Sequence, residues 1–199
     1  MRVLIIGGSG VIGRAVVAAF KDIDDEVIAL SRSTCPAVDI TDAASVKAAL
    51  AEVGTVDAVV SVTGKVPYVH TTEATLEDFQ AGFANKLGGQ ISLVLAGVRH
   101  IAPQGSFTLT TGILAQHSVP GSVIAGTVNG GIEAFIRTAA LDLPAGVRIN
   151  AVSPTIIDRP NGHSAIFPGF PGVSPEEAAQ AYVRSAHGIE TGQVFRVWG

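Results

Sequence analysis

The first twenty residues constrain the fold of this chain more than any other stretch. An apolar run over residues 3–6 ends in the glycine-rich turn Gly7-Gly8-Ser9-Gly10, and Gly13 leads into a second apolar run. This order predicts a buried strand, a tight turn and a helix. Residues without a Cβ let the backbone approach a ligand closely, and a helix N-terminus offers free N–H groups to a pyrophosphate.

Two interpretations of this turn are open. A glycine-rich turn between a strand and a helix also occurs without a ligand, and the spacing here differs slightly from the strict G-x-G-x-x-G form. The strand before it and the helix after it, within a unit of βαβ size, favour dinucleotide binding. The cofactor-binding residues that we predict at the turn are Gly7, Ser9, Gly10, Val11, Ile12 and Gly13.

Composition narrows the class of protein. The 199 residues are 47% hydrophobic and 15% charged, which is typical of one globular domain over residues 1–199. The longest apolar run is too short to span a membrane, and a strand follows Met1 directly, so we expect no membrane segment and no signal peptide. The net charge of -4 disfavours nucleic acid as a partner.

The cysteine and the histidines are equally informative. A lone Cys35 excludes an intramolecular disulfide and fits a reducing cytoplasm, where we expect the protein to be. The five histidines have no cysteine or carboxylate at the spacing of metal ligands, so we predict no metal. They are His70, His100, His117, His163 and His187.

Strand and helix patterns alternate along the chain. Strands are expected over residues 3–6, 26–30, 38–42, 56–62, 106–109, 147–152 and 193–197. Helices are expected after Gly13 and over residues 43–51, 76–100, 122–143 and from 175, the third of them interrupted near Gly88-Gly89. The alternation predicts an α/β fold: a single-domain, Rossmann-type, doubly wound parallel sheet of about seven strands with helices on both faces. The Pro- and Gly-rich residues 158–174 are predicted to form a mobile loop, with Ser174 as the cap of the last helix.

Polar clusters follow the predicted strands at their carboxyl ends, where doubly wound sheets bind ligands. These clusters are 7–13, 31–32, 63–64, 110–111 and 153–154. Their coincidence at one edge of the sheet predicts a single cofactor crevice.

Residues after the second strand bear on the choice of cofactor. Ser31-Arg32-Ser33 holds no acidic side chain to bind a ribose 2′-hydroxyl, whereas Arg32 can pair with a 2′-phosphate. A solvated surface arginine is the alternative. The pattern favours NADP over NAD, with Ser31 and Arg32 at the phosphate and Asp39 and Ile40 beside the adenine ring.

Together these segments resemble the short-chain dehydrogenase/reductase family over essentially the whole chain. The motifs are G-G-S-G-V-I-G at 7–13, V-D-I-T-D at 38–42, S-V-T-G at 61–64, Asn85, V-R-I-N-A-V-S-P at 147–154 and T-G-Q-V at 191–194. The resemblance implies a nicotinamide cofactor, a small-molecule substrate and a homo-oligomer, dimer or tetramer. It adds Thr63, Gly64, Pro154 and Ile156 to the predicted cofactor residues.

The family's catalytic motif is missing. Its chemistry rests on Tyr-x-x-x-Lys and a preceding serine, but the matching register places Ala125 and Asn129 at the tyrosine and lysine positions. The serine position falls to Thr111 or Gly112, of which Thr111 keeps a hydroxyl. We expect that Ala125→Tyr with Asn129→Lys would raise carbonyl reduction. The catalytic residues that we predict are Thr111, Asn129 and Asn85, the last as the family's structural and proton-relay asparagine.

A substitute for the missing acid is needed if hydride transfer occurs, because Ala125 cannot transfer a proton. Tyr68, His70 and His117 are candidates, and Lys65 and Lys86 are candidates for the missing charge; solvated surface residues are the alternative for all five.

Two functions follow from these observations. The first is an NADP(H)-dependent oxidoreductase that transfers hydride between a carbonyl and an alcohol with a variant site. The second is a catalytically inactive NADP(H)-binding, sensor or interaction protein, and a structural subunit is a weaker third. The compact loop over residues 158–173 suggests a small or shallow substrate site, and no residue pattern names the substrate.

Overall fold

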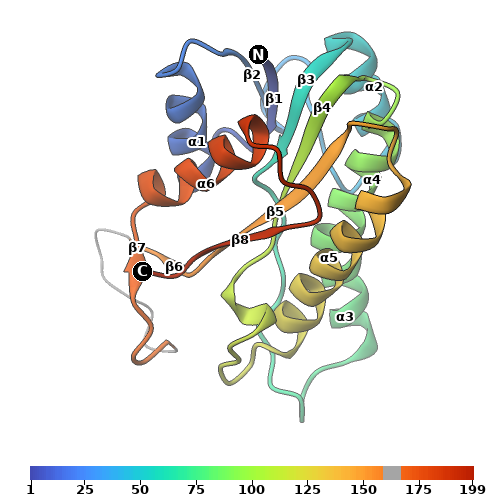
Figure 1. The fold of residues 1–199 in the computed structure, drawn as a ribbon. Coiled ribbons are helices and arrows are strands. Elements are labelled where there is room, and N and C mark those ends of the chain that lie inside the picture. The colour runs from blue at the N-terminus through green and yellow to red at the C-terminus, as the bar shows by residue number, and fades with distance from the viewer. Residues whose placement is uncertain (159–166) are drawn as a thin grey trace.

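A six-stranded parallel sheet forms the centre of the computed structural model, which describes residues 1–158 and 167–199 (Figure 1). Its order is β2-β1-β3-β4-β5-β8, and every neighbouring pair is parallel. The strands are β1 (Arg2–Ile6), β2 (Glu26–Leu30), β3 (Val56–Ser61), β4 (Ile101–Thr110), β5 (Arg148–Pro154) and β8 (Val194–Val197). The predicted fold class is therefore confirmed.

The strand count differs from the prediction. Residues 38–42 form no strand, which leaves six strands in the sheet instead of about seven. Val38 and Ile40 lie in an irregular segment, and their side chains are buried in the core. Their apolar character is therefore explained by burial and does not require a strand. The short strands β6 (Ile156–Ile157) and β7 (Gly172–Val173) pair with each other outside the main sheet.

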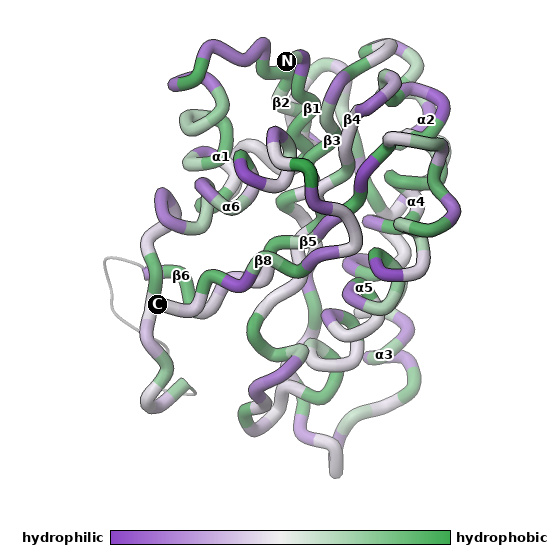
Figure 2. Tube along the Cα trace, viewed as in Figure 1, coloured by the Kyte–Doolittle hydropathy of each residue, from purple (hydrophilic) through white to green (hydrophobic). Residues whose placement is uncertain are grey.

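Helices cover both faces of the sheet (Figure 1). Helices α1 (Val11–Lys21) and α6 (Pro175–His187) share one buried apolar cluster with the sheet. Helices α2 (Ala43–Val53), α4 (Gly89–Gly97) and α5 (Val123–Asp142) share the other. Side chains alternate between the clusters along β1, with Val3 and Ile5 on one face and Leu4 and Ile6 on the other. Figure 2 accordingly colours β1 hydrophobic along most of its length, as two-sided burial requires.

Hydroxyl groups join β4 to α6. Thr108 Oγ1 lies 2.7 Å from Ser185 Oγ, and Thr110 Oγ1 lies 2.8 Å from Tyr182 Oη. Thr110 Oγ1 also donates to the carbonyl of Ser61 at 2.6 Å. Burial raises the pKa of Tyr182, which is fully enclosed. This tyrosine therefore holds α6 in place.

The predicted helix over residues 76–100 runs through its glycine pair. Helix α3 (Leu76–Gly82) continues as a π-helical segment (Phe83–Gly88) and then as α4. A Cβ at Gly89 would lie 2.7 Å from Ile40 Cδ1. The glycine thus allows the close approach of Ile40, whose side chain belongs to the core.

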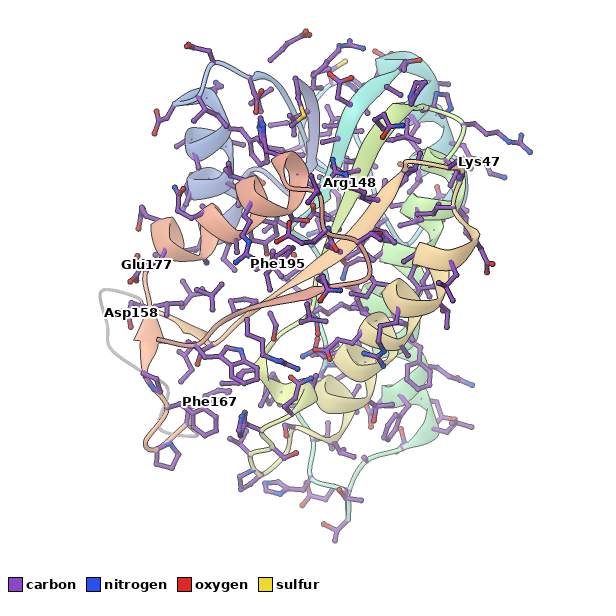
Figure 3. All side chains as sticks on the ribbon, in the orientation of Figure 1. Lys47, Arg148, Asp158, Phe167, Glu177 and Phe195 are labelled. Atoms are coloured by element: carbon purple, nitrogen blue, oxygen red, sulfur yellow. The ribbon has the colours of Figure 1, made fainter. Side chains whose placement is uncertain are left out.

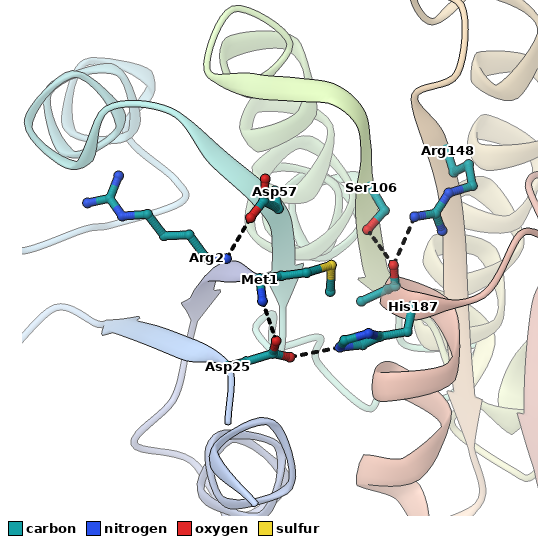
Figure 4. Close-up of polar contacts among 8 residues, drawn as sticks. Met1, Arg2, Asp25, Asp57, Ser106, Arg148 and His187 are labelled. Carbon is teal, nitrogen blue, oxygen red and sulfur yellow. Dashed lines mark hydrogen bonds and ion pairs between the residues drawn. The ribbon is translucent and has the colours of Figure 1, made fainter. Parts of the chain in front are cut away.

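The amino ends of the strands are held by a polar cluster on the edge shown in Figure 4. Arg148 donates to the carbonyls of Ser185 and Ala186 at 3.0 and 2.9 Å, and thereby pairs free carbonyls in the last turn of α6. Asp25 accepts hydrogen bonds from the Met1 nitrogen and from His187. Figure 3 places Arg148 at the end of the sheet opposite Phe167.

Part of the predicted mobile loop, residues 159–166, lies outside the described residues. Ser174 caps α6 as predicted, since its hydroxyl accepts from the N–H of Glu177. Among residues 1–158 and 167–199 no helix is long and apolar enough to cross a membrane, and no three His, Cys, Asp or Glu side chains are grouped to hold a metal ion.

We predict that Arg148→Met lowers the free energy of unfolding by about 2 kcal/mol, because helix-end carbonyls lose a charged donor. Urea titration monitored by circular dichroism measures this change. Arg137→Met, at an exposed position of α5, is the control and should stay within about 0.5 kcal/mol of the unchanged protein. Equal effects of the two substitutions would contradict the assignment.

Candidate active site

A pocket of about 660 Å³ lies at the carboxyl ends of β1, β3, β4 and β5. The predicted crevice is therefore present at the expected edge of the sheet. Of the predicted site residues, those that line it are Gly10, Val11, Ile12, Gly13, Thr63, Gly64, Thr111, Asn129, Pro154 and Ile156.

The glycine turn forms one end of this pocket. A Cβ on Gly13 would lie 2.1 Å from the carbonyl oxygen of Gly7, so α1 can approach the turn only with glycine at this position. Gly7 itself has a φ of 92°. Helices α2, α3 and α6 each begin with a side chain that accepts from a backbone N–H, but α1 begins at Gly10 without such a cap. Its first N–H groups are left to face the pocket.

The predicted adenosine-side residues lie after β2, outside the pocket lining. Arg32 is exposed, and Ser31 Oγ lies 3.1 Å from Ser33 Oγ. Hydrogen bonds from the N–H and hydroxyl of Thr41, and the nearby Arg32 charge, lower the pKa of Asp39. The remaining predicted residues outside the lining are Gly7, Ser9, Ile40 and Asn85.

Lys86 is the residue whose role sequence reasoning underrated. Its Nζ donates to Asn129 Oδ1 at 2.8 Å and to the carbonyl oxygen of Thr111 at 3.1 Å. Desolvation by burial lowers the pKa of this lysine to about 8. The ammonium therefore lies beside the predicted lysine position, although it arrives from the helix on which Asn85 lies.

The backbone around Lys86 is shaped to admit it. A Cβ on Gly64, whose φ is 115°, would lie 2.4 Å from Lys86 Cγ. Lys86 itself belongs to the π-helical segment, a distortion that often occurs at functional sites. Neighbouring Asn85 accepts a hydrogen bond from the N–H of Lys65 at 2.7 Å, and so fixes the loop after β3. Asn85 acts on the pocket through that loop.

The carbonyl and the hydroxyl of Thr111 have different partners, and only the carbonyl contacts Lys86. The hydroxyl donates to the carbonyl of Asn129 at 3.2 Å and approaches Glu133 Oε1 at 3.4 Å. Gln116 Nε2 donates to the other Glu133 oxygen at 2.6 Å. Buried Glu133 is thus a second residue that the sequence analysis missed, and its place one turn after Asn129 on α5 was the available signal.

Ala125 and Asn129 both lie on α5 and line the pocket, but each already has close neighbours. Ala125 is buried in an apolar cluster with Ile113 and Leu114. A lysine at position 129 would bring a second ammonium against Lys86. The structure therefore argues against the gain expected from Ala125→Tyr with Asn129→Lys.

The three candidate acids differ in whether they line the pocket. Tyr68 lines the pocket, and burial raises the pKa of its phenol. His70 and His117 do not line it. The His117 ring packs edge-on against Trp198, with centroids 5.1 Å apart. Tyr68 and Lys86 are left as the candidates that reach the pocket, together with Lys65 on its rim.

Known proteins share this fold along its whole length. A family model described as "Enoyl-(Acyl carrier protein) reductase" matches residues 12–192. L-xylulose reductase of Bos taurus is 28% identical over 183 residues, which cover 82% of this chain and 75% of that protein.

Two solved structures are also similar. The protein lin1944 from Listeria innocua is 38% identical with a TM-score of 0.96, and the match covers 100% of both chains. A small-chain dehydrogenase in complex with NADPH is 25% identical with a TM-score of 0.89, over 99% of this chain and 96% of that one.

We predict that Gly64→Ala destabilises the protein by about 2 kcal/mol, because an alanine at this φ is strained and its Cβ overlaps Lys86. Differential scanning calorimetry measures the change. Gly130→Ala is the matched control, since a Cβ there meets nothing within 4 Å and α5 gains a better helix former. If Gly64→Ala were as well tolerated as Gly130→Ala, the close approach would be wrong.

We also predict that Lys86 titrates at about 8. The chain has four lysines, so ¹³Cε-labelled lysine gives few resonances to assign by NMR. Lys47, which is exposed on α2, gives the reference resonance in the same spectra. A Lys86 resonance that followed Lys47 would show that the ammonium is solvated.

Proposed function

The chain belongs to the short-chain dehydrogenase/reductase family, and from this membership we propose that it is an NADP(H)-dependent oxidoreductase that interconverts a carbonyl and an alcohol with a variant site. The observation that carries the proposal is the single pocket that joins the uncapped start of α1 to the polar group around Lys86. A cofactor lying along this pocket would bring its reactive ring from the phosphate-binding end to a group able to handle a proton.

The residues present fit a dinucleotide. Gly7 and Gly13 let α1 pack closely on the turn, because a Cβ at either position would overlap neighbouring protein atoms, and the free N–H groups of α1 suit a pyrophosphate. Exposed Arg32 suits a 2′-phosphate, and Lys65 and Lys86 are the charged side chains among the residues that line the pocket. The related small-chain dehydrogenase complexed with NADPH supports NADP in preference to NAD.

The cofactor, when bound, would supply or accept the hydride. This chain's own residues would position the reactants: Asn129 and the Thr111 carbonyl hold Lys86, while Asn85 holds the adjoining loop. These three are positioning residues in this proposal. The reductases among the relatives favour reduction of a small organic substrate. We also propose that the protein acts in the cytoplasm as a homo-oligomer.

Ala125 favours a second candidate function. Its side chain has no proton to transfer, and it is buried in an apolar cluster. A protein that binds NADP(H) and acts through a partner needs no proton donor at this position. Turnover of a carbonyl compound by the purified protein separates the two functions.

Calorimetric titration with NADPH and NADH tests the cofactor assignment. We expect NADPH to bind more tightly, and Arg32→Ala to reduce its affinity about tenfold or more while leaving NADH unchanged, because only the 2′-phosphate is paired with this guanidinium. Exposed Arg99→Ala is the control. If neither nucleotide binds, the enzyme proposal fails at its first step.

A further inference from the structure

We propose that Lys86 is the catalytic proton donor, delivering its proton to the substrate oxygen from the long helix in place of the absent tyrosine on α5. The inference rests on the proposed function, because it assigns a role within the same reductive site. It differs from a ribose-binding role for a lysine, since it places Lys86 in contact with the reacting oxygen.

Hydrogen bonding leaves one proton of Lys86 available. An ammonium has three N–H donors, and two of them are directed at Asn129 Oδ1 and the Thr111 carbonyl oxygen. No acceptor for the third is found among residues 1–158 and 167–199, and Lys86 lines the pocket. The two fixed acceptors orient the third N–H toward a ligand without further ordering of the side chain.

The position is well suited to an acid at neutral pH. Burial brings the pKa of Lys86 to about 8, close to the range in which a general acid works best. Tyr68 lines the same pocket, but burial raises the pKa of its phenol, which makes it a weaker acid. Lys86 is therefore the better donor of the two.

The charged side chains near Lys86 come from the loop after β3 and from α5. Lys65, on the loop after β3, lines the same pocket. Glu133 on α5 is separated from it by the hydroxyl of Thr111 at the end of β4. No carboxylate lines the pocket among the described residues, so no ion pair neutralises the ammonium there.

The reaction balances with this assignment. A hydride supplied by the reduced nicotinamide adds to the carbonyl carbon, and the electron pair of the C=O π bond passes to oxygen. That oxygen takes a proton from Lys86 Nζ, so an O–H bond forms as an N–H bond breaks. Lys86 is left as a neutral amine and regains a proton from water. In the reverse direction the neutral amine accepts the alcohol proton.

The lining also indicates the class of substrate. One wall of the pocket is apolar and consists of Ala125, Ile113 and Leu114. Tyr68 and Phe167 also line the pocket. Figure 3 shows Phe167 at this end of the molecule. An uncharged aldehyde or ketone with an apolar or aromatic body fits that wall and presents its oxygen as the sole polar atom.

The test compares the full-length protein with Lys86→Met, Lys86→Arg and the control Lys47→Met. NADPH binding is measured by calorimetry, and reduction of benzaldehyde and cyclohexanone at saturating NADPH is measured from pH 6 to 9.5. We expect Lys86→Met to bind NADPH within about threefold of the unchanged protein and to lose at least about a hundredfold in turnover. Lys86→Arg keeps the positive charge and the fold but holds its proton too tightly, so it should also lose activity.

The pH profile is the second readout. Reduction by the unchanged protein should fall about tenfold per unit above pH 8, whereas oxidation of benzyl alcohol with NADP, which needs the neutral amine, should rise up to about pH 8 and level off above it. Both inflections should be missing from the residual activity of Lys86→Arg, and Lys47→Met should keep both.

Several outcomes overturn the proposal. Full turnover by Lys86→Met or Lys86→Arg excludes Lys86 as the donor and leaves the proposed function standing. Loss of NADPH binding in proportion to turnover would make Lys86 a cofactor ligand instead. If the unchanged protein binds NADPH but reduces neither probe, the proposed function itself fails, and the role of Lys86 fails with it.

Discussion

Burial of the parallel sheet on both faces decides where chemistry can occur in this molecule. Helices cover each face, so the side chains of the central strands are almost all enclosed, and the buried threonines of β4 pair with hydroxyls of α6. Unpaired polar groups can then gather only where strands end. The close approach of Gly13 to Gly7 fixes the start of α1 at that edge, and the remaining site residues are arranged relative to it.

The position of Lys86 places an ammonium beside Asn129, although the two residues are far apart in the chain. The sequence motif predicts that Asn129 stands at the family's lysine position, and in the structure its side-chain oxygen accepts a hydrogen bond from the ammonium of Lys86 at 2.8 Å. A short residue on α5 is what leaves room for a long one from the other helix. Sequence comparison at position 129 alone would describe this site as lacking a cation, whereas the folded site contains one.

Much of this arrangement could be predicted from the sequence, and the exceptions have physical causes. Glycine turns and apolar strands are local patterns, so the sheet edge and the turn at Gly13 were predictable. The prediction of a strand over residues 38–42 was wrong, because buried positions are apolar whether or not the backbone pairs in a sheet. Lys86 was underrated because its meaning depends on Asn129 and Thr111, which are far away in the chain. The relevant signal was local: Lys86 directly follows Asn85.

The hydroxyl pairs between β4 and α6 have a further consequence for how this chain can change. Apolar contacts allow a helix to slide along a sheet with little loss, but Thr108 with Ser185 and Thr110 with Tyr182 are matched at one translational setting only. These contacts therefore fix the position of α6 along the sheet, whatever the length of the segment that precedes the helix. Insertions or deletions between β6 and α6 can therefore occur while α6 and the sheet stay in register.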